Sequence, residues 1–400
     1  MVPPGSSGAS PWRLHLLANH HPALHGLRVL AIFAVVQLHV SVAFERTGLL
    51  RRGAFYDRSM SVWFAMDLFF FLSGFLIGTM LLRDETTLDA RRAVRFWVRR
   101  AFRIVPPYLV VLTALACIGP LSAAQRGNLW REYAYLTNYF PQRGPPVMVW
   151  AWSLCVEEHF YLLVPLLVAA LGLLASSRAR AVALVLLWCS GLALRVGDVA
   201  LFHPGASFGE LFFQVYPRTH LRYDILVAGV LAAHLQHRHG ADIAAVMRRP
   251  GVRVAVIAFV AGCFALLLSP PAAIPEPLRW SLWWSGLTSV CFLPLVLLVV
   301  NHRGAVGRAL GHRSFLVVAT LGYGVYLVHP AVIDRVVVPA VIAGATVLWT
   351  SRGVLLPFGV LWTIAVALAM AGSLGLAALL HLLVEKPSLA LRDRLAPGSG

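Results

Sequence analysis

Residues 61–82 read SVWFAMDLFFFLSGFLIGTMLL, and this stretch decides the class of fold. It holds 22 residues and a single ionisable side chain, Asp67. A helix needs about 20 mostly apolar residues to cross the hydrocarbon core of a bilayer. The stretch therefore predicts a transmembrane helix.

Nine more segments of the same kind flank this one. The predicted spans are 27–44, 61–82, 104–120, 152–174, 180–201, 221–236, 252–269, 280–300, 314–333 and 354–384. The apolar stretch 335–350 adds a candidate half-span. Because backbone polar groups in lipid must be satisfied within the segment, we expect an all-α, polytopic bundle of about ten transmembrane helices.

The remaining segments are short. Residues 1–12 are rich in Pro, Gly and Ser and predict a disordered tail without the charged start of a cleavable signal peptide. We expect one transmembrane domain over 13–387, a short basic tail over 388–400 and no appended hydrolase domain.

The composition excludes most soluble enzymes. Of 400 residues, 59% are hydrophobic and 13% charged, whereas soluble domains are nearer about 50% and 25%. The net charge is +17, and Lys386 is the sole lysine, so the excess is arginine. The arginines concentrate in alternate loops, and the positive-inside rule then makes these loops and both termini cytoplasmic. Segment 45–60 also holds arginines and does not fit this alternation. Since topology explains the charge, we expect a multi-pass protein of the cell membrane and no nucleic-acid partner.

No metal site is predicted. The five cysteines are scattered singly, without the paired spacing of a zinc site or a disulfide framework. The histidine clusters at 20–25 and 234–239 lack carboxylate or thiolate partners, so we interpret them as residues of the cytoplasmic face.

Ionisable side chains inside the spans are candidates for function because their insertion is costly. Arg28 and His39 lie 11 residues apart, which is about 16 Å of helical rise and almost a whole number of turns. They therefore share one face of the first helix. The alternatives are an arginine that extends to the interface and a histidine bonded to the backbone.

Arginines also form a stripe at the start of the third span, at 92, 95, 99 and 103. They favour either anionic lipid or the phosphates of a ligand, and the spacing does not separate the two. Glu157 and Glu158 open the fourth span beside a histidine, which packing does not explain. For Arg222 and Asp224 we expect an internal ion pair, and for Ser73-Gly74 a close approach of two helices.

Six blocks then appear in order, and together they resemble the membrane acyltransferase family 3. Members of this family are integral-membrane O-acyltransferases that modify surface polysaccharides, lipids and macrolide-type sugars. The blocks are Arg28-x10-His39, Phe-Phe-x-Leu-Ser-Gly-Phe-Leu-Ile at 69–77, Arg-Arg-x-x-Arg-Ile-x-Pro-x-Tyr at 99–108, Trp-Ser-Leu-x-x-Glu-Glu-x-Phe-Tyr at 152–161, Tyr-x-x-Tyr-Leu-x-His at 323–329, and Glu-Lys-Pro at 385–387. His25 departs from the usual Asp, and His159 from the usual Gln.

The resemblance implies an acyl-coenzyme A donor, most simply acetyl-coenzyme A, with no permanently bound cofactor. The acceptor would be a hydroxyl group of a glycan, glycolipid or macrolide sugar. His39 would be the general base, oriented by Glu157 or Glu158. Direct transfer and an acyl-His39 intermediate both stay open. Donor-binding residues would be Arg28, Arg99, Arg100 and Arg103, and substrate-binding residues Asp67, Ser73, Trp152, Tyr323, Tyr326 and His329.

Two rival functions fit the intramembrane charges. A proton-coupled transporter or exporter of a glycolipid or small solute would use His, Glu and Arg as a relay. Such proteins often show internal repeats, and none is found here. A non-catalytic scaffold would not require so many polar groups at one depth. The sequence does not specify the acceptor, the acyl length or the oligomeric state.

Overall fold

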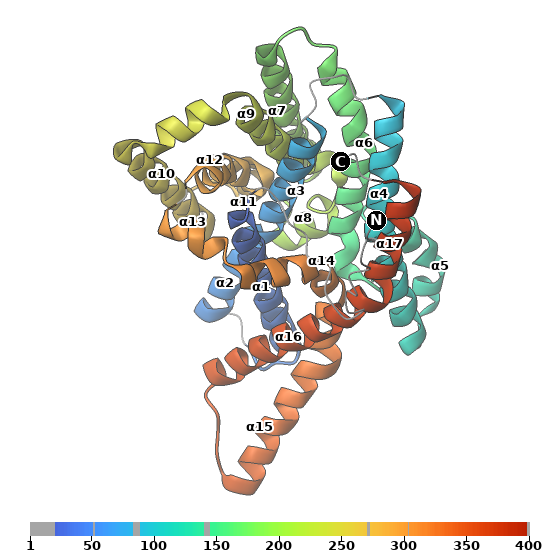
Figure 1. The fold of residues 1–400 in the computed structure, drawn as a ribbon. Coiled ribbons are helices and arrows are strands. Elements are labelled where there is room, and N and C mark those ends of the chain that lie inside the picture. The colour runs from blue at the N-terminus through green and yellow to red at the C-terminus, as the bar shows by residue number, and fades with distance from the viewer. Residues whose placement is uncertain are drawn as a thin grey trace, which may run out of the picture.

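The chain is all-helical wherever the structure describes it. The computed structural model describes residues 21–50, 53–82, 89–139, 145–269, 273–302 and 304–397, and no β-strand occurs in these ranges (Figure 1). The predicted tail 1–12 and the last three residues of the basic tail lie outside them.

Seventeen α-helices follow one another along these residues. They are α1 (Ala23–Arg46), α2 (Ala54–Met60), α3 (Ala65–Leu81), α4 (Ala90–Ile118), α5 (Ala123–Tyr133), α6 (Trp152–Gly172), α7 (Ser177–Phe202), α8 (Phe208–Gln214), α9 (Tyr223–Arg248), α10 (Pro250–Leu268), α11 (Glu276–Leu282), α12 (Thr288–Asn301), α13 (Ala305–Leu310), α14 (Arg313–Val332), α15 (Val338–Arg352), α16 (Phe358–Leu380) and α17 (Lys386–Leu395).

The helices confirm a multi-pass membrane protein. Within the described residues, nine helices are long and apolar enough to cross a bilayer. Each coincides with or overlaps one predicted span. The tenth predicted span, 221–236, lies in α9, which is not among the nine. The first half of α9 is buried against other helices, and its second half carries polar and charged residues such as His237, Arg238 and His239. Which terminus faces the cytoplasm stays a prediction.

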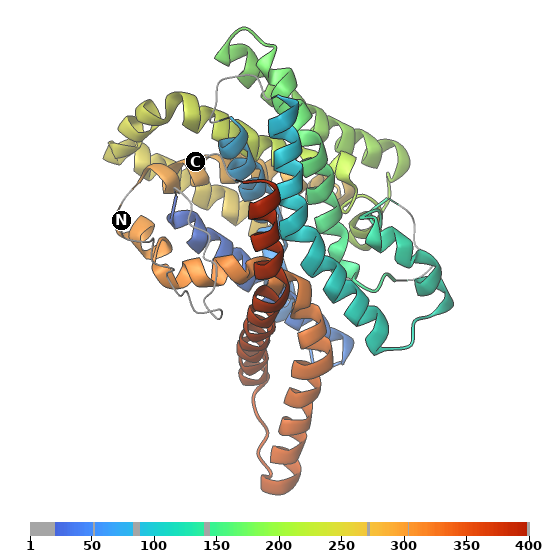
Figure 2. The same cartoon turned by 45° about the vertical axis from the view of Figure 1, so that its right-hand side comes forward.

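Residues 335–350 do not form a separate half-span. A π-helical turn at Ile333–Val337 joins α14 to α15, so that one helix runs over Arg313–Arg352. The end of α15 and the start of α16 form a hairpin that projects from the other helices (Figures 1 and 2). The candidate half-span is therefore an extension of the helix before it.

Backbones of α3 and α9 touch at the centre of the bundle. A Cβ atom on Gly74 would lie 2.0 Å from the Leu226 carbonyl oxygen, and one on Gly229 would lie 2.2 Å from that of Phe71. Side chains cannot occupy such space, so glycine is required at both positions. The predicted close approach of helices at Ser73-Gly74 is confirmed.

Two buried ion pairs join the helices around this contact. The guanidinium of Arg195 donates to both carboxylate oxygens of Asp224, at 3.2 and 2.9 Å. Arg222 donates instead to Asp67, and all four side chains are fully buried. The expectation that Arg222 pairs with Asp224 is wrong. At the start of a helix, residues two apart point away from each other, and each found a partner on another helix.

Candidate active site

Two histidines from helices far apart in sequence meet inside the bundle. His39 in α1 and His329 in α14 have ring centroids 4.8 Å apart, and the His329 Nε2 lies 3.2 Å from the His39 Nδ1. His329 is fully buried, whereas His39 is partly accessible. The face of α1 that carries His39 packs against α14, which explains the meeting.

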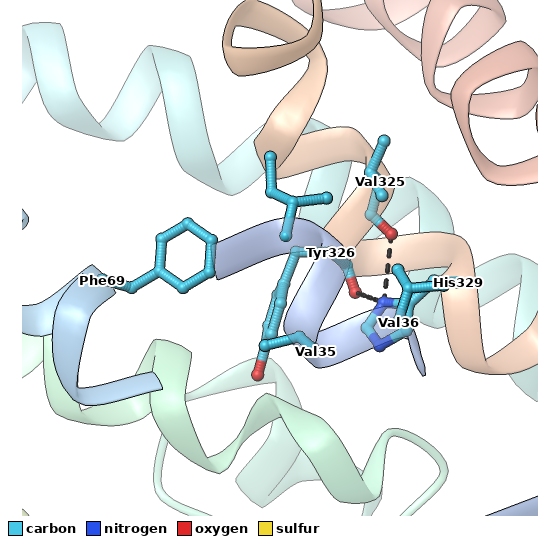
Figure 3. A pocket seen from close by; sticks show the side chains of 7 residues that line it. Val35, Val36, Phe69, Val325, Tyr326 and His329 are labelled. Carbon is cyan, nitrogen blue, oxygen red and sulfur yellow. Dashed lines mark hydrogen bonds between the residues drawn. The ribbon is translucent and has the colours of Figure 1, made fainter. Parts of the chain in front are cut away.

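Pro330 explains how the His329 ring is held. A proline has no N–H, so the carbonyl of the residue four positions earlier, Tyr326, loses its helical donor. The His329 Nδ1 lies 2.9 Å from that oxygen and 3.1 Å from the Val325 oxygen (Figure 3). Carbonyl oxygens only accept, so this Nδ1 carries the hydrogen.

The same reasoning assigns the hydrogens of the pair. The His39 Nδ1 lies 2.9 Å from the Val35 carbonyl, so it too is an N–H. It can share that hydrogen with the His329 Nε2, which must then be bare. The remaining nitrogen, His39 Nε2, has no hydrogen-bond partner among the described residues. The Nε2 of His39 is therefore the nitrogen of the pair that is open to accept a proton, and the role of His39 as general base stays a prediction.

A narrow cavity lies between α1, α3 and α14, next to this pair. Its apolar lining comes from Ile32, Val35, Val36, Phe69 and Val325, and its two polar residues are Tyr326 and His329 (Figure 3). The α1 residues of this lining lie between Arg28 and His39 in sequence and continue the face that these two share. One helix face thus carries an arginine, an apolar cavity wall and the histidine.

Three arginines gather around the Arg28 end of that face. Arg28, Arg100 and Arg103 are close enough to interact electrostatically with one another. Glu157 lies within the same range of Arg28 and Arg100, and Glu385 of Arg103. We call Arg28, Arg100 and Arg103 the arginine cluster.

Arg99 does not belong to the arginine cluster. Its guanidinium donates to the Ala396 carbonyl at 2.7 Å and to the Asp393 carboxylate at 3.2 Å, both at the end of α17. The helix α17 packs along the flank of α4 that Arg99 faces. Arg99 and Arg103, two members of the stripe at 92, 95, 99 and 103, therefore face different neighbours.

The two adjacent glutamates lie with the arginines and tyrosines. The polar neighbours of Glu157 are Arg100, Ser73, Arg28 and Tyr161. No hydrogen bond joins His39 to Glu157 or to Glu158 among the described residues. His329 occupies the position beside His39 that sequence reasoning gave to a glutamate, and the catalytic role of the glutamates stays a prediction.

Three of the other predicted substrate-binding residues, Ser73, Tyr323 and Trp152, contact different parts of the chain. Ser73 shares a hydrogen bond of 2.6 Å with Tyr161, near Glu157. Tyr323 donates to the Ile104 carbonyl at 2.8 Å. Trp152 packs against Tyr216, with ring centroids 4.9 Å apart.

Tyr326 and Asp67 are held by other parts of the chain. The Tyr326 hydroxyl donates to the Trp150 carbonyl at 2.7 Å and also contacts the Ser153 hydroxyl. Asp67 accepts from Arg222, from the Ser285 N–H at 3.1 Å and from the Thr288 hydroxyl at 2.7 Å. Its carboxylate is thus surrounded by protein donors.

Sequence reasoning missed Glu132, which shapes the segment before α6. This buried carboxylate accepts the backbone N–H groups of Val147 and Met148, each at 2.8 Å. The same segment supplies the Trp150 carbonyl that holds Tyr326. Burial raises the pKa of Glu132, and the two backbone hydrogen bonds oppose that effect. No pattern in the polar helix α5 indicates this role.

A metal centre is not indicated within the described ranges, because no three His, Cys, Asp or Glu side chains gather there.

Comparison with known proteins places this arrangement in a family. A Bacillus subtilis protein named "Putative peptidoglycan O-acetyltransferase YrhL" is 26% identical over 342 residues, and the match covers 79% of this chain and 49% of that protein. The peptidoglycan O-acetyltransferase OatA of Listeria monocytogenes is 24% identical, covering 78% and 49%. The O-acetyltransferase OatA of Staphylococcus aureus is 24% identical, covering 78% and 50%. The chain thus spans about half the length of these relatives.

No solved structure matches the chain. The model of the acyltransferase-domain family matches residues 21–382. This range includes five of the six sequence blocks, all but the one at 385–387, and both histidines of the His39–His329 pair. The chain therefore belongs to the acyltransferase-domain family, acyltransferase family 3.

Proposed function

We propose that the chain is a membrane O-acetyltransferase that moves an acetyl group from acyl-coenzyme A to a hydroxyl group of a glycan. The observation that carries this proposal is the order of features along α1. Arg28 lies at one end, the cavity wall in the middle and His39 at the other end.

The arginine cluster suits the donor's phosphates. Arginine forks match phosphate oxygens in geometry. The donor's phosphates would replace or join Glu157, Glu158 and Glu385, the carboxyl groups that now lie near the three guanidinium groups. The rise of about 16 Å between Arg28 and His39 matches an extended pantetheine arm. The arm would run beside the cavity and not through it, because the cavity has room for about one water-sized group. The thioester would then reach the histidine pair while the phosphates stay at the arginines.

The transfer step uses the free nitrogen of His39. Its Nε2 accepts the proton of the acceptor hydroxyl as the hydroxyl oxygen bonds to the thioester carbonyl carbon. The carbon–sulfur bond then breaks, and the coenzyme A thiolate takes the proton from Nε2. The Nδ1 hydrogen, shared with His329 and Val35, keeps the ring oriented while it is cationic. The same nitrogen could instead attack first and form an acyl-His39 intermediate.

A glycan acceptor is supported by the names of the relatives. The Listeria protein is named for O-acetylation of peptidoglycan, a polymer that bears sugar hydroxyl groups. At 24% identity over half of that protein, the likeness supports the acceptor class and leaves the individual glycan open.

The test is transfer by the purified protein in lipid nanodiscs, with radiolabelled acetyl-coenzyme A and soluble glycan fragments. His39→Ala should slow transfer by roughly 10²- to 10⁴-fold, the usual contribution of a general base. His234→Ala is the matched control, because His234 is a buried histidine bonded to Ser177 away from the pair. Transfer by His39→Ala at the wild-type rate would refute the assignment. A wild type that moves solute across vesicles without releasing coenzyme A would favour the transporter.

A further inference from the structure

We infer that the cavity beside His329 receives the methyl end of the donor's acyl group and restricts transfer to acetyl, with Val36 and Val325 as the residues that set its size. This inference rests on the proposed function and adds to it the control of acyl length.

The cavity is small. It has room for about one group of the size of a water molecule, which is also about the size of a methyl group. An acetyl group ends in one methyl, whereas propionyl and butyryl groups carry one and two further methylenes. The space therefore matches the end of an acetyl group, whereas a longer chain would have to extend out of the cavity or displace its walls.

The cavity surface is apolar in practice, although two polar residues line it. The His329 Nδ1 is taken by backbone carbonyls and its Nε2 by His39. The Tyr326 hydroxyl is directed to the Trp150 carbonyl and Ser153. With these atoms engaged, the groups that face the cavity are carbon. Such a space favours a hydrocarbon end over water or a hydroxyl group.

The position of the cavity suits an acyl end. His329 both lines the cavity and contacts His39, the proposed base. An acyl group whose carbonyl carbon is held near the histidine pair would have its methyl end within reach of the apolar surface that His329 lines. Figure 3 shows His329 beside the apolar residues of this cavity.

Val36 and Val325 are suitable as size determinants because they cannot move aside. They come from α1 and α14, and each is 1% exposed. Valine in a helix has one strongly preferred rotamer, so its methyl groups form a stiff wall. Truncation to alanine removes two methyl groups from one side of the cavity without touching His39 or His329.

The experiment measures kcat/KM for acetyl-, propionyl- and butyryl-coenzyme A with one acceptor, in wild type, Val36→Ala and Val325→Ala. One methylene in a hydrophobic pocket changes specificity by about 10- to 200-fold. We expect the propionyl-to-acetyl ratio to rise by a factor in that range in both variants. Matched controls are Val40→Ala and Val328→Ala, which truncate buried valines of the same two helices outside the cavity lining. Their ratios should equal that of the wild type.

Each outcome decides a separate question. If wild type transfers acetyl and neither cavity variant changes the ratio, the inference is overturned while the proposed function stands. Equal rises in the control variants would also overturn it, because general loosening would then explain the change. If wild type transfers no acyl group from coenzyme A, the proposed function fails. A thermal unfolding midpoint close to that of the wild type shows that each variant is folded, and Val325→Ala tests the inference if Val36→Ala does not accumulate.

Discussion

Asp67→Asn tests whether Asp67 binds substrate, as the family resemblance implies, or stabilises the fold through Arg222. The substitution keeps the size of the side chain and removes its charge. In the structure, Asp67 and Arg222 are both fully buried and paired. We expect the variant to lose stability, with activity per folded molecule little changed.

The magnitude follows from what the asparagine leaves behind. Its side-chain oxygen can still accept from Ser285 N–H or Thr288, at positions now 3.1 and 2.7 Å from the carboxylate. The Arg222 charge, however, remains buried without a counter-charge. Breaking a buried pair in this way costs about 3–5 kcal/mol, and we expect the lower end because some hydrogen bonds survive. At about 1.4 kcal/mol per factor of ten, the unfolding constant should rise by roughly 100-fold or more.

The assay is thermal unfolding in detergent, followed by transfer activity normalised to folded protein. Asp57→Asn is the control, because it makes the same change at an exposed position. Asp67→Asn combined with Arg222→Gln should recover much of the loss, since no unpaired charge remains. A variant of wild-type stability with no activity would refute the structural role and restore Asp67 as a substrate ligand.

Three more predictions follow from the site. His329→Ala removes a neutral hydrogen bond to His39, worth about 0.5–1.5 kcal/mol, so transfer should slow by roughly 2- to 13-fold; a loss beyond about 10²-fold would make His329 itself the base. Arg100→Ala should raise the donor KM by roughly 10- to 150-fold, the value of one charged hydrogen bond, and Arg99→Ala should leave it near wild type because α17 engages that side chain; equal effects would contradict the separation of Arg99 from the arginine cluster. Burial raises the pKa of Glu132, so the stability that its protonated form contributes is lost as pH rises through the folded-state pKa. Melting temperatures measured between about pH 4 and pH 8 should show this fall in the wild type and lack it in Glu132→Gln. Parallel melting curves for the two proteins would contradict the prediction.

The sequence predicts the helices because membrane insertion imposes a simple rule on each segment. A run of about 20 apolar residues must be a helix, whatever its neighbours are. The shared face of Arg28 and His39 follows from helical geometry in the same way. The close approach of a second helix at Gly74 could also be predicted, because a small residue within an aromatic run indicates a helix–helix contact.

Partners across the bundle could not be predicted, because they depend on packing between distant segments. Arg222 pairs with Asp67, 155 residues away, although Asp224 is two residues away. His39 meets His329, 290 residues away, although the glutamates of α6 looked more suitable. Arg99 and Arg103 lie one turn apart on α4, and the position of α17 separates them. The spacing of residues along one helix shows which side chains share a face of that helix. It does not show which other helix packs against that face.

Pro330 has no backbone N–H, and this affects how the histidine pair is accommodated in a membrane-spanning helix. A histidine base is commonly oriented by a carboxylate, and such a group would bring a charge into a membrane-spanning segment, at a cost of about 2.5–3.5 kcal/mol or more. Here, main-chain oxygens hold both rings, and the Tyr326 oxygen is available because of that proline. Because main-chain oxygens and not carboxylates hold the two rings, the support of the pair adds no fixed charge, and charge would appear there when His39 accepts a proton.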